Sequence, residues 1–259
     1  MTTRQGRPYR VGMIVPSSDT TSETEIPELL RRQQAAGGER FSVHSARLRL
    51  QQVTPEAVQK LNDAADGAVD LLCDAKVDAI LHACLIAVMA GGRQGILQTR
   101  AQLVARAAAT GRSPPAVVSS AGALVGALAH LHATRVSMIT PYRKALTARV
   151  AATLGECGVE VVQCRSLEVV DNLEVGRLDP MKLLALAAQM DFSGSDALVL
   201  SACAQMPSLD VIEEAEQRFG LPVLSAATAS TFALLERLGL QPQIGDAGML
   251  LRSRGAIVS

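Results

Sequence analysis

Two stretches of the sequence, VDAILHAC at residues 77–84 and SDALVLSAC at residues 195–203, are near repeats of each other. In each, an aspartate precedes a short, largely apolar run, and a cysteine closes it. A run of this kind is typical of a strand that is buried on both faces of a parallel sheet. The repeat therefore predicts two equivalent strands, with Cys84 and Cys203 at their ends.

Two further pairs of segments repeat in the same order along the chain. They are VGMIVPSSDTT (11–21) with RVSMITPYRKA (135–145), and PPAVVSSAGALVGAL (114–128) with LPVLSAATASTFAL (221–234). The partners lie more than about 100 residues apart, which is too far for the short period of a solenoid. The repeats predict two similar α/β units related by a pseudo-twofold axis, although βα units resemble one another in many proteins.

Short apolar runs alternate with longer Ala- and Leu-rich segments of helical period, which predicts an α/β fold with parallel sheets. The expected strands are 10–15, 41–47, 78–83, 115–119, 135–139, 159–164, 196–201 and 222–224. The expected helices are 22–35, 55–75, 93–110, 121–132, 143–157, 180–191, 208–219 and 228–238. We expect residues 1–119 together with about 228–259 to form one unit and residues 120–227 to form the other, with the active site between them.

The composition is that of a folded protein with no charge bias. The chain has 259 residues, 48% of them apolar, and 25 basic residues against 25 acidic ones. These values exclude a disordered chain and give no electrostatic basis for binding nucleic acid or an anionic membrane. No apolar run reaches the roughly 18 residues of a membrane span, and the N-terminus lacks the apolar core of a signal peptide. We therefore expect a cytoplasmic protein.

The five cysteines are odd in number and have no metal-binding spacing, so we expect reduced thiols and no metal. Cys73, Cys157 and Cys164 have no counterpart in the repeats and are interpreted as packing residues. The first strand is followed by PSSDTT (16–21) and not by a glycine-rich loop. A dinucleotide cofactor is therefore not expected.

Ligands of open α/β sheets bind beyond the carboxyl ends of the strands, which makes Cys84 and Cys203 the candidate catalytic residues. One thiolate can attack a substrate or abstract a proton on one face, and the other thiol can donate a proton on the opposite face. A single cysteine at a strand end is more often a small buried side chain, but the matched pair favours catalysis. His82 either tunes the nearby Cys84 thiol or is an ordinary core histidine.

Polar residues in the loops complete the predicted site. Ser17 and Asp19 follow the first strand, Tyr142 follows the equivalent strand of the repeat, and Asn172 lies in a later loop. Hydroxyl and amide groups of this kind can donate hydrogen bonds to a substrate carboxylate. Taken singly, each of these residues also suits an ordinary turn.

Over nearly its whole length the chain resembles the maleate cis–trans isomerases of the aspartate/glutamate racemase superfamily. The segments that carry the resemblance are VPSSDTTSETEIP (15–27), HACLIAVMAGG (82–92), TPY (140–142), DNLEVGRLDP (171–180) and LSACAQMPSLDVI (200–212). The resemblance implies a cofactor-free, homo-oligomeric enzyme that converts maleate to fumarate. It implies Cys84 as the nucleophile, Cys203 as the second acid/base thiol, and Tyr142 and Asn172 as residues that hold the substrate carboxylates.

One departure from the family pattern concerns the substrate. Similar family members usually carry Asn where this chain has Asp19, and an ionised Asp accepts hydrogen bonds but cannot donate them. It also repels a dianionic substrate. Two alternatives therefore stay open: a racemase or decarboxylase in which the two thiols exchange an α-proton, and a non-catalytic protein that binds a small acid.

Overall fold

The computed structural model describes residues 7–50, 54–111 and 113–252. The strands are β1 (Tyr9–Pro16), β2 (Phe41–Leu48), β3 (Ala79–His82), β4 (Ala116–Ser119), β5 (Arg135–Thr140), β6 (Glu160–Ser166), β7 (Ala197–Ser201) and β8 (Val223–Ser225). The helices are α1 (Ser22–Gly37), α2 (Pro55–Asp74), α3 (Leu85–Met89), α4 (Gly92–Ala109), α5 (Ser120–His130), α6 (Lys144–Glu156), α7 (Asn172–Val175), α8 (Pro180–Ala187), α9 (Leu209–Phe219), α10 (Ala226–Arg237) and the 3-10 helix η1 (Met249–Leu251).

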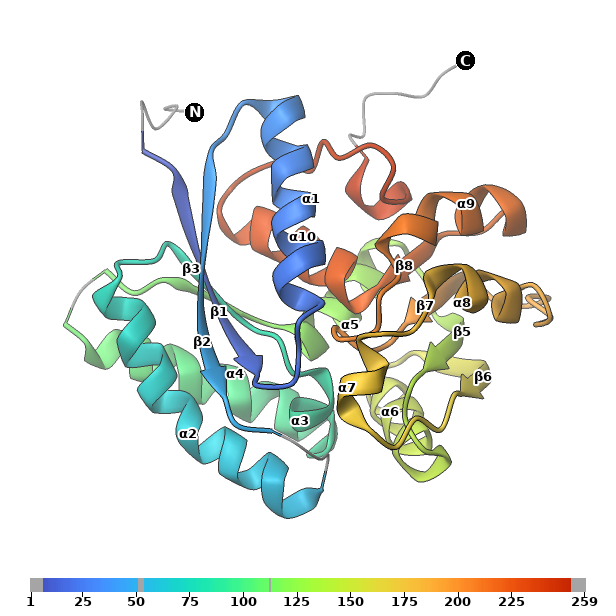
Figure 1. The fold of residues 1–259 in the computed structure, drawn as a ribbon, viewed down its shortest axis with the longest axis horizontal. Coiled ribbons are helices and arrows are strands. Elements are labelled where there is room, and N and C mark those ends of the chain that lie inside the picture. The colour runs from blue at the N-terminus through green and yellow to red at the C-terminus, as the bar shows by residue number, and fades with distance from the viewer. Residues whose placement is uncertain (1–6, 51–53, 112, 253–259) are drawn as a thin grey trace.

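The strands form two four-stranded parallel sheets, which lie side by side in Figure 1. The strand order is β2-β1-β3-β4 in the first sheet and β6-β5-β7-β8 in the second, so the second sheet repeats the order of the first. This equivalence confirms the prediction of two similar parallel-sheet units. The division of the chain between the units stays a prediction.

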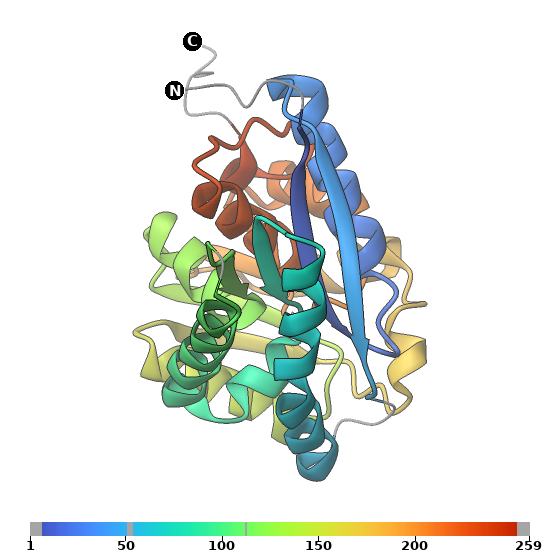
Figure 2. The ribbon, with the colours of Figure 1, turned by 90° about the vertical axis from the view of Figure 1, so that its left-hand side faces the viewer.

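Helices cover both faces of the first sheet. Helices α2 and α4 pack on one face (Figure 2), whereas α1 and α10 pack on the other. Helix α10 follows the last strand of the second sheet but packs against α1, β3 and β4 of the first. By packing against the first sheet, α10 contributes to the contact between the two units.

Glu25 of α1 forms a second link between the units. One oxygen of its carboxylate accepts hydrogen bonds from the backbone N–H groups of Ser208, at 2.6 Å, and Leu209, at 2.7 Å. These two groups lie at the start of α9, whose first N–H groups have no partner within the helix. Burial raises the pKa of the Glu25 carboxyl to about 7.

Every predicted strand and helix is present, with ends shifted by a few residues. The helices that the sequence did not predict are α3, α7 and η1, which are five, four and three residues long. Such segments are too short to display a helical period, so a periodicity search does not detect them. Two of them, α3 and α7, carry residues of the site described below.

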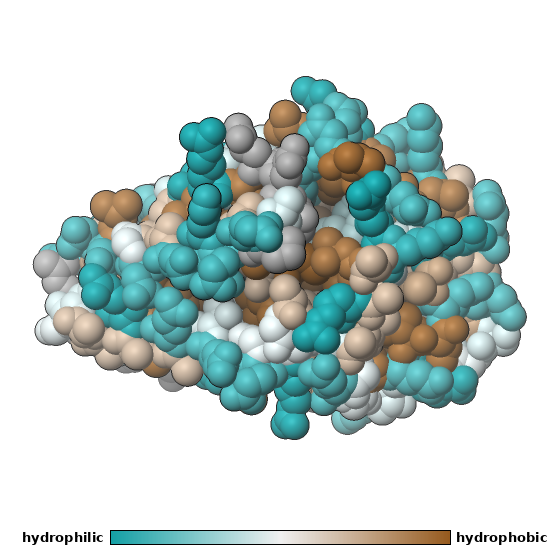
Figure 3. All heavy atoms as spheres, turned by 90° about the horizontal axis from the view of Figure 1, so that it is seen from below, coloured by the Kyte–Doolittle hydropathy of each residue, from teal (hydrophilic) through white to brown (hydrophobic). Residues whose placement is uncertain are grey.

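Apolar residues appear at scattered points among hydrophilic ones on the face seen in Figure 3. Single exposed apolar side chains are normal on a folded protein. Within the residues that the structure describes, no helix combines the length and the apolar character needed to cross a membrane.

Candidate active site

A small closed cavity lies where the ends of strands from the two units meet. Its volume is about 20 Å³, which leaves room for about one water molecule. The lining residues with reactive or hydrogen-bonding side chains are Asp19, Cys84, Tyr142, Asn172, Cys203 and Gln205. The structure thus brings together five of the six residues named from the sequence, and Ser17 does not line the cavity.

Cys84 lies between β3 and α3 and is 5% exposed. Its sulfur accepts a hydrogen bond from the backbone N–H of Ala87, in the first turn of α3. Burial outweighs this bond and raises the pKa of the thiol to about 12, and the nearby Cys203 and Asp19 add to the rise. Cys84 is therefore a protonated thiol at neutral pH while the cavity is closed.

Cys203 follows β7 and is 9% exposed. Burial raises the pKa of its thiol to about 11. Three donors oppose the rise: the hydroxyl of Tyr142 and the backbone N–H groups of Gln205 and Met206. Because donors to sulfur favour the thiolate, this sulfur is better prepared than that of Cys84 to carry a transient negative charge.

Tyr142 is held in the turn that follows β5 and is 7% exposed. Its carbonyl accepts a short hydrogen bond from the hydroxyl of Ser166, which ties the turn to the neighbouring strand β6. Burial, together with the hydrogen bond to Cys203, keeps the pKa of the phenol well above its usual value. Tyr142 is thus a neutral hydrogen-bond donor that faces the cavity.

Asp19 is 1% exposed, and both of its carboxylate oxygens are occupied. One accepts a hydrogen bond from the backbone N–H of Ser22, at 3.0 Å, and the other from the hydroxyl of Ser22, at 2.6 Å. Ser22 is the first residue of α1, where a carboxylate is favoured. Burial nevertheless raises the pKa of Asp19 above its usual value. Asp19 therefore both accepts a hydrogen bond from the first N–H group of α1, whose N-cap residue is Thr21, and lines the cavity.

A hydrogen-bonded bridge closes the cavity between the units. The side-chain amide of Asn172 donates to the hydroxyl of Ser18 at 2.5 Å. The side-chain amide of Gln205 donates to the carbonyl of Ser18 at 3.0 Å and, through a short bond, to the carbonyl of Asn172. Ser18 belongs to the loop after β1, whereas its two partners follow β6 and β7.

The sequence did not single out Ser18 or Gln205. Gln205 lies two residues after Cys203, and the equivalent position after Cys84 is Ile86, so the repeat offered no polar match. Of the two serines in the first loop, the sequence favoured Ser17. That residue is exposed, and its hydroxyl accepts a hydrogen bond from the backbone N–H of Leu50 at 3.1 Å. A contact of Ser17 with substrate stays a prediction.

His82 is fully buried, and within the described residues neither ring nitrogen has a hydrogen-bond partner. Burial lowers the pKa of the imidazole to about 4, so the ring is neutral at physiological pH. A direct hydrogen bond to the Cys84 thiol is thus excluded in this structure. Of the two interpretations of His82, the structure supports the ordinary core histidine.

The remaining cysteines lie elsewhere. Cys73 is buried on α2, Cys157 is half-buried at the end of α6, and Cys164 is exposed on β6. The prediction that Cys164 packs inside the protein is wrong, because β6 is an edge strand and its residues are only partly covered. Across the described residues, no three His, Cys, Asp or Glu side chains are grouped so that they could hold a metal ion.

Sequence comparison agrees with this geometry. Residues 11–251 match the family described as arylmalonate decarboxylase. The maleate isomerase of Geobacillus stearothermophilus is 43% identical over 247 residues, which are 95% of this chain and 98% of that protein. The maleate isomerase of Nocardia farcinica is 45% identical over 250 residues, or 96% of this chain and 98% of that protein.

Solved structures of maleate isomerases and arylmalonate decarboxylases are also similar to this chain. The Nocardia farcinica maleate cis–trans isomerase, as a cysteine-to-serine mutant with a covalently bound succinylcysteine intermediate, has a TM-score of 0.91 at 43% identity. The alignment covers 95% of this chain and 99% of that one. An arylmalonate decarboxylase variant shares the fold, with a TM-score of 0.79 at 21% identity and cover of 95% and 99%. The chain is an enzyme of the Asp/Glu racemase-like arylmalonate decarboxylase family and belongs, within it, to the maleate isomerases.

Proposed function

We propose that the chain converts maleate to fumarate through a covalent adduct on Cys84. The observation that carries this proposal is the pair of thiols, Cys84 and Cys203, that line one cavity from two equivalent strand ends. The succinylcysteine held by the Nocardia farcinica enzyme supports an adduct of the same kind here. The steps below transfer only protons and the electron pairs of C–S and C=C bonds, so we propose that no cofactor is required.

The first step is addition. The thiolate of Cys84 attacks one alkene carbon of maleate and forms a C–S bond, and the π electron pair moves to the neighbouring carbon beside the second carboxylate. The thiol of Cys203 gives its proton to that carbon. The product is a succinyl group on Cys84, in which the former double bond is a single bond and can rotate.

The second step is elimination after rotation. The thiolate of Cys203 takes a proton from the carbon that it protonated, and the electron pair of that C–H bond forms the new double bond. The electron pair of the C–S bond leaves with Cys84. Fumarate is released, and both sulfurs return to their starting protonation states. The three donors around Cys203 support this role, because they stabilise its transient thiolate.

The reaction requires two changes from the closed state. The pKa of about 12 for Cys84 means that its proton must pass to solvent water before the thiolate can attack. A cavity of about 20 Å³ does not hold a dicarboxylate, so the two units must also separate to admit the substrate. Opening lets water reach the Cys84 thiol and reduces the burial that raises its pKa.

We assign the substrate carboxylates to the donors that line the cavity. The phenol of Tyr142 is neutral and the amide of Asn172 carries two N–H groups, so neither repels a dianion. Asp19 assists only in its protonated form, and the burial that raises its pKa favours that form. Ser17, which lies outside the closed cavity, can take part only after the loop has moved.

Proton NMR with maleate as the only added reagent tests the proposal. We expect fumarate to appear with the purified protein, to appear equally after treatment with a chelator, and to be absent with Cys84→Ala. Loss of α-deuterium from a labelled amino acid or loss of CO₂ from a substituted malonate, without isomerisation, would instead favour the racemase or decarboxylase alternative. Maleate binding without turnover would favour a binding protein.

The assembly and the compartment are separate proposals. The family resemblance is the support for a homo-oligomer. The support for a cytoplasmic location is that no apolar run of the sequence is as long as a membrane span.

A further inference from the structure

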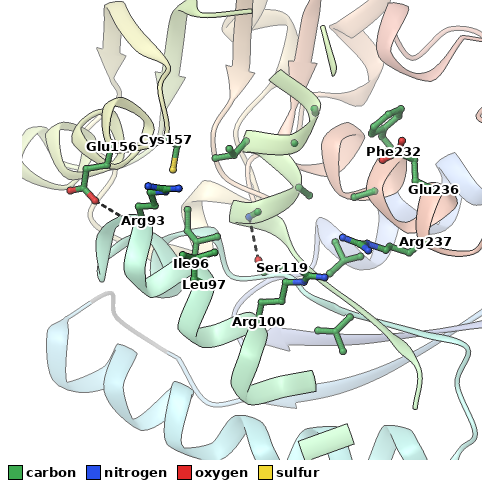
Figure 4. A pocket seen from close by; sticks show the side chains of 18 residues that line it. Arg93, Ile96, Leu97, Arg100, Ser119, Glu156, Cys157, Phe232, Glu236 and Arg237 are labelled. Atoms are coloured by element: carbon green, nitrogen blue, oxygen red, sulfur yellow. Dashed lines mark hydrogen bonds between the residues drawn. The ribbon is translucent and has the colours of Figure 1, made fainter. Parts of the chain in front are cut away.

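The thiol cavity has an acid in its lining but no cation. Within the described part of the chain, none of the residues that line it is an arginine, a lysine or a histidine. By contrast, the groove between α4, α5 and α10 has Arg93, Arg100 and Arg237 along its walls (Figure 4). A dianion that enters the thiol cavity therefore meets Asp19 without a positive side chain to offset it.

Arg47 of β2 contacts the loop that carries Asp19, but the charge of this arginine is already compensated. Its guanidinium donates hydrogen bonds to the main-chain carbonyls of Ser17 and Asp19, each at 2.9 Å. It also forms an ion pair with Glu23 of α1. Because Glu23 offsets the positive charge, Arg47 holds the shape of the loop without making the cavity positive.

The two units contribute different hydrogen-bonding groups to the cavity. Cys84 and Cys203 follow the equivalent strands β3 and β7, and Asp19 and Tyr142 lie in the loops after the equivalent strands β1 and β5. Tyr142 is a donor, whereas ionised Asp19 can only accept. A substrate with two identical carboxylates therefore suits the side of Tyr142 better than the side of Asp19.

Ionised Asp19 has the capacity for a further hydrogen bond. The two oxygens of a carboxylate can accept about four hydrogen bonds in all. The backbone N–H and the hydroxyl of Ser22 each donate to a different oxygen, and the backbone N–H of Thr21 is a third donor. One more donor, supplied by the substrate, would complete the set.

We infer that the protein also isomerises maleamate, the half-amide of maleate, to fumaramate, with the amide N–H donated to Asp19 and the carboxylate held by Tyr142 and Asn172. This inference rests on the proposed function, because the same two thiols carry out the chemistry. Maleamate has one negative charge where maleate has two, and its amide group has nearly the size of a carboxylate. It relieves the repulsion from Asp19 and adds a charge-assisted hydrogen bond, which is roughly twice as strong as a neutral one.

The reaction follows the steps given above for maleate. The thiolate of Cys84 forms a C–S bond to the alkene carbon that bears the carboxylate, and the π electron pair moves to the carbon beside the amide. The thiol of Cys203 protonates that carbon. After rotation, the thiolate of Cys203 takes the proton back, the electron pair of the C–H bond forms the trans double bond, and the electron pair of the C–S bond leaves with Cys84. The amide bond stays intact, and no other reagent is consumed.

The preference for the half-amide should grow with pH. Burial raises the pKa of Asp19, so the neutral form, which suits a carboxylate, is lost as the pH rises through the raised value, and the acceptor form replaces it. The charged and titratable groups around Asp19 are Glu23, Glu25, Arg47, Cys84, Tyr142 and Cys203. Among them, Glu25 has a pKa of about 7. Glu25 is still present in Asp19→Asn, so this variant separates the titration of the two acids.

Proton NMR with maleate and with maleamate, over a range of neutral and alkaline pH, is the test. The two alkene protons of fumaramate are inequivalent and those of fumarate are not, so the products are distinguishable, and a sample without protein reports any uncatalysed hydrolysis. At the alkaline end we expect kcat/KM of the wild type to be at least about tenfold higher for maleamate than for maleate.

The ratio of the two kcat/KM values, compared between the wild type and Asp19→Asn, isolates the contact between Asp19 and the amide. Ionisation of Cys84 and of the substrates affects both proteins and cancels. Asp19→Asn should lose most of the preference for maleamate and its rise with pH. Asp179→Asn is the matched control, because it makes the same change at the start of α8, where the side chain accepts the N–H of Met181 and does not line the cavity.

Competitive inhibition by succinamate and succinate measures binding without chemistry, since neither compound has a double bond. Succinamate should inhibit the wild type more strongly than succinate does, and the difference should shrink in Asp19→Asn. Turnover of maleate without turnover of maleamate would overturn the inference and leave the proposed function in place. Turnover of maleamate alone would contradict the proposed function and support the inference. A preference for maleamate as large in Asp19→Asn as in the wild type would also overturn the inference, because Asp19 would then have no part in it.

Discussion

The hydroxyl of Tyr142 donates a hydrogen bond to the sulfur of Cys203, and this bond holds the pKa of the thiol below the value that burial alone would give. Tyr142→Phe removes the donor and leaves the ring in place. The pKa of Cys203 should therefore rise, and its alkylation by iodoacetamide at a fixed pH should become about tenfold slower for each unit of rise. Labelling of Cys84, followed by peptide mass spectrometry, is the internal control. Unchanged labelling of Cys203 would mean that its two backbone donors suffice.

If Cys84 is the nucleophile, as proposed, its replacement should be the most damaging of the five cysteine changes. Cys84→Ala should abolish fumarate formation. Cys73→Ala, Cys157→Ala and Cys164→Ala should keep most of the rate, because these side chains do not line the cavity. The measurement is the rate of conversion of maleate to fumarate by each variant, followed by NMR. A loss of activity in Cys164→Ala as severe as in Cys84→Ala would refute the assignment.

Cys203→Ser should separate addition from elimination. Serine has a much higher pKa than cysteine and is a poor proton acceptor, so elimination from the succinyl adduct should be slow. Intact-protein mass spectrometry after incubation with maleate should detect one added maleate on Cys84, and Cys84→Ala should carry none. Maleimide should still label Cys84 in Cys203→Ser. Faster maleimide labelling of Cys203 than of Cys84 in the wild type would reverse the two roles.

Gln205 should act on binding more than on chemistry, because its side chain bridges the carbonyls of Ser18 and Asn172 across the two units. Gln205→Glu keeps the size of the side chain but removes both donated bonds and places a carboxylate against two carbonyl oxygens. We expect the Michaelis constant for maleate to rise about thirtyfold, since the two lost bonds together contribute about 2 kcal/mol. The turnover number should change little, because the backbone N–H of Gln205 still reaches Cys203. A fall in turnover number alone would contradict this role.

The two sheets and the pair of thiols could be predicted from the sequence because both are properties of repeated local patterns. Apolar runs determine the strands, and the repeat puts Cys84 and Cys203 at equivalent strand ends. The bridge of Ser18, Asn172 and Gln205 could not be predicted in this way. It joins residues up to 187 positions apart, and two of its three bonds end on main-chain carbonyls, which any residue type carries.

The burial of single side chains also could not be predicted reliably from the sequence. Cys164 was interpreted as a packing residue because it has no counterpart in the repeats, but its strand lies at the edge of the second sheet. Strand order depends on how all four strands pair, and the sequence of one strand does not contain it. The same reasoning applies to Ser17 and Ser18, since neighbouring residues of a turn can exchange inside and outside positions through a small change of backbone angles.

Asp19 lies where the resemblance to the family leads us to expect Asn, and its replacement by Asn tests whether the difference affects the substrate. When ionised, Asp19 repels a substrate carboxylate. Its raised pKa means that the neutral donor form persists to a higher pH than for an ordinary aspartate, and that this form is lost as the pH rises through the raised value. The Michaelis constant of the wild type for maleate should therefore increase with pH over this interval.

Asp19→Asn removes the charge at nearly the same volume. Its Michaelis constant should be lower than that of the wild type by about tenfold, equivalent to about 1.4 kcal/mol of relieved repulsion, and should lose the Asp19-dependent rise with pH. Asn at this position can still accept the hydrogen bond from the backbone N–H of Ser22, so the first N–H group of α1 should keep its partner. Steady-state kinetics at several pH values, with the melting temperature as a control for folding, provide the measurement. Identical Michaelis constants and pH profiles would mean that Asp19 serves α1 alone, and that its carboxylate stays with Ser22 when the cavity opens.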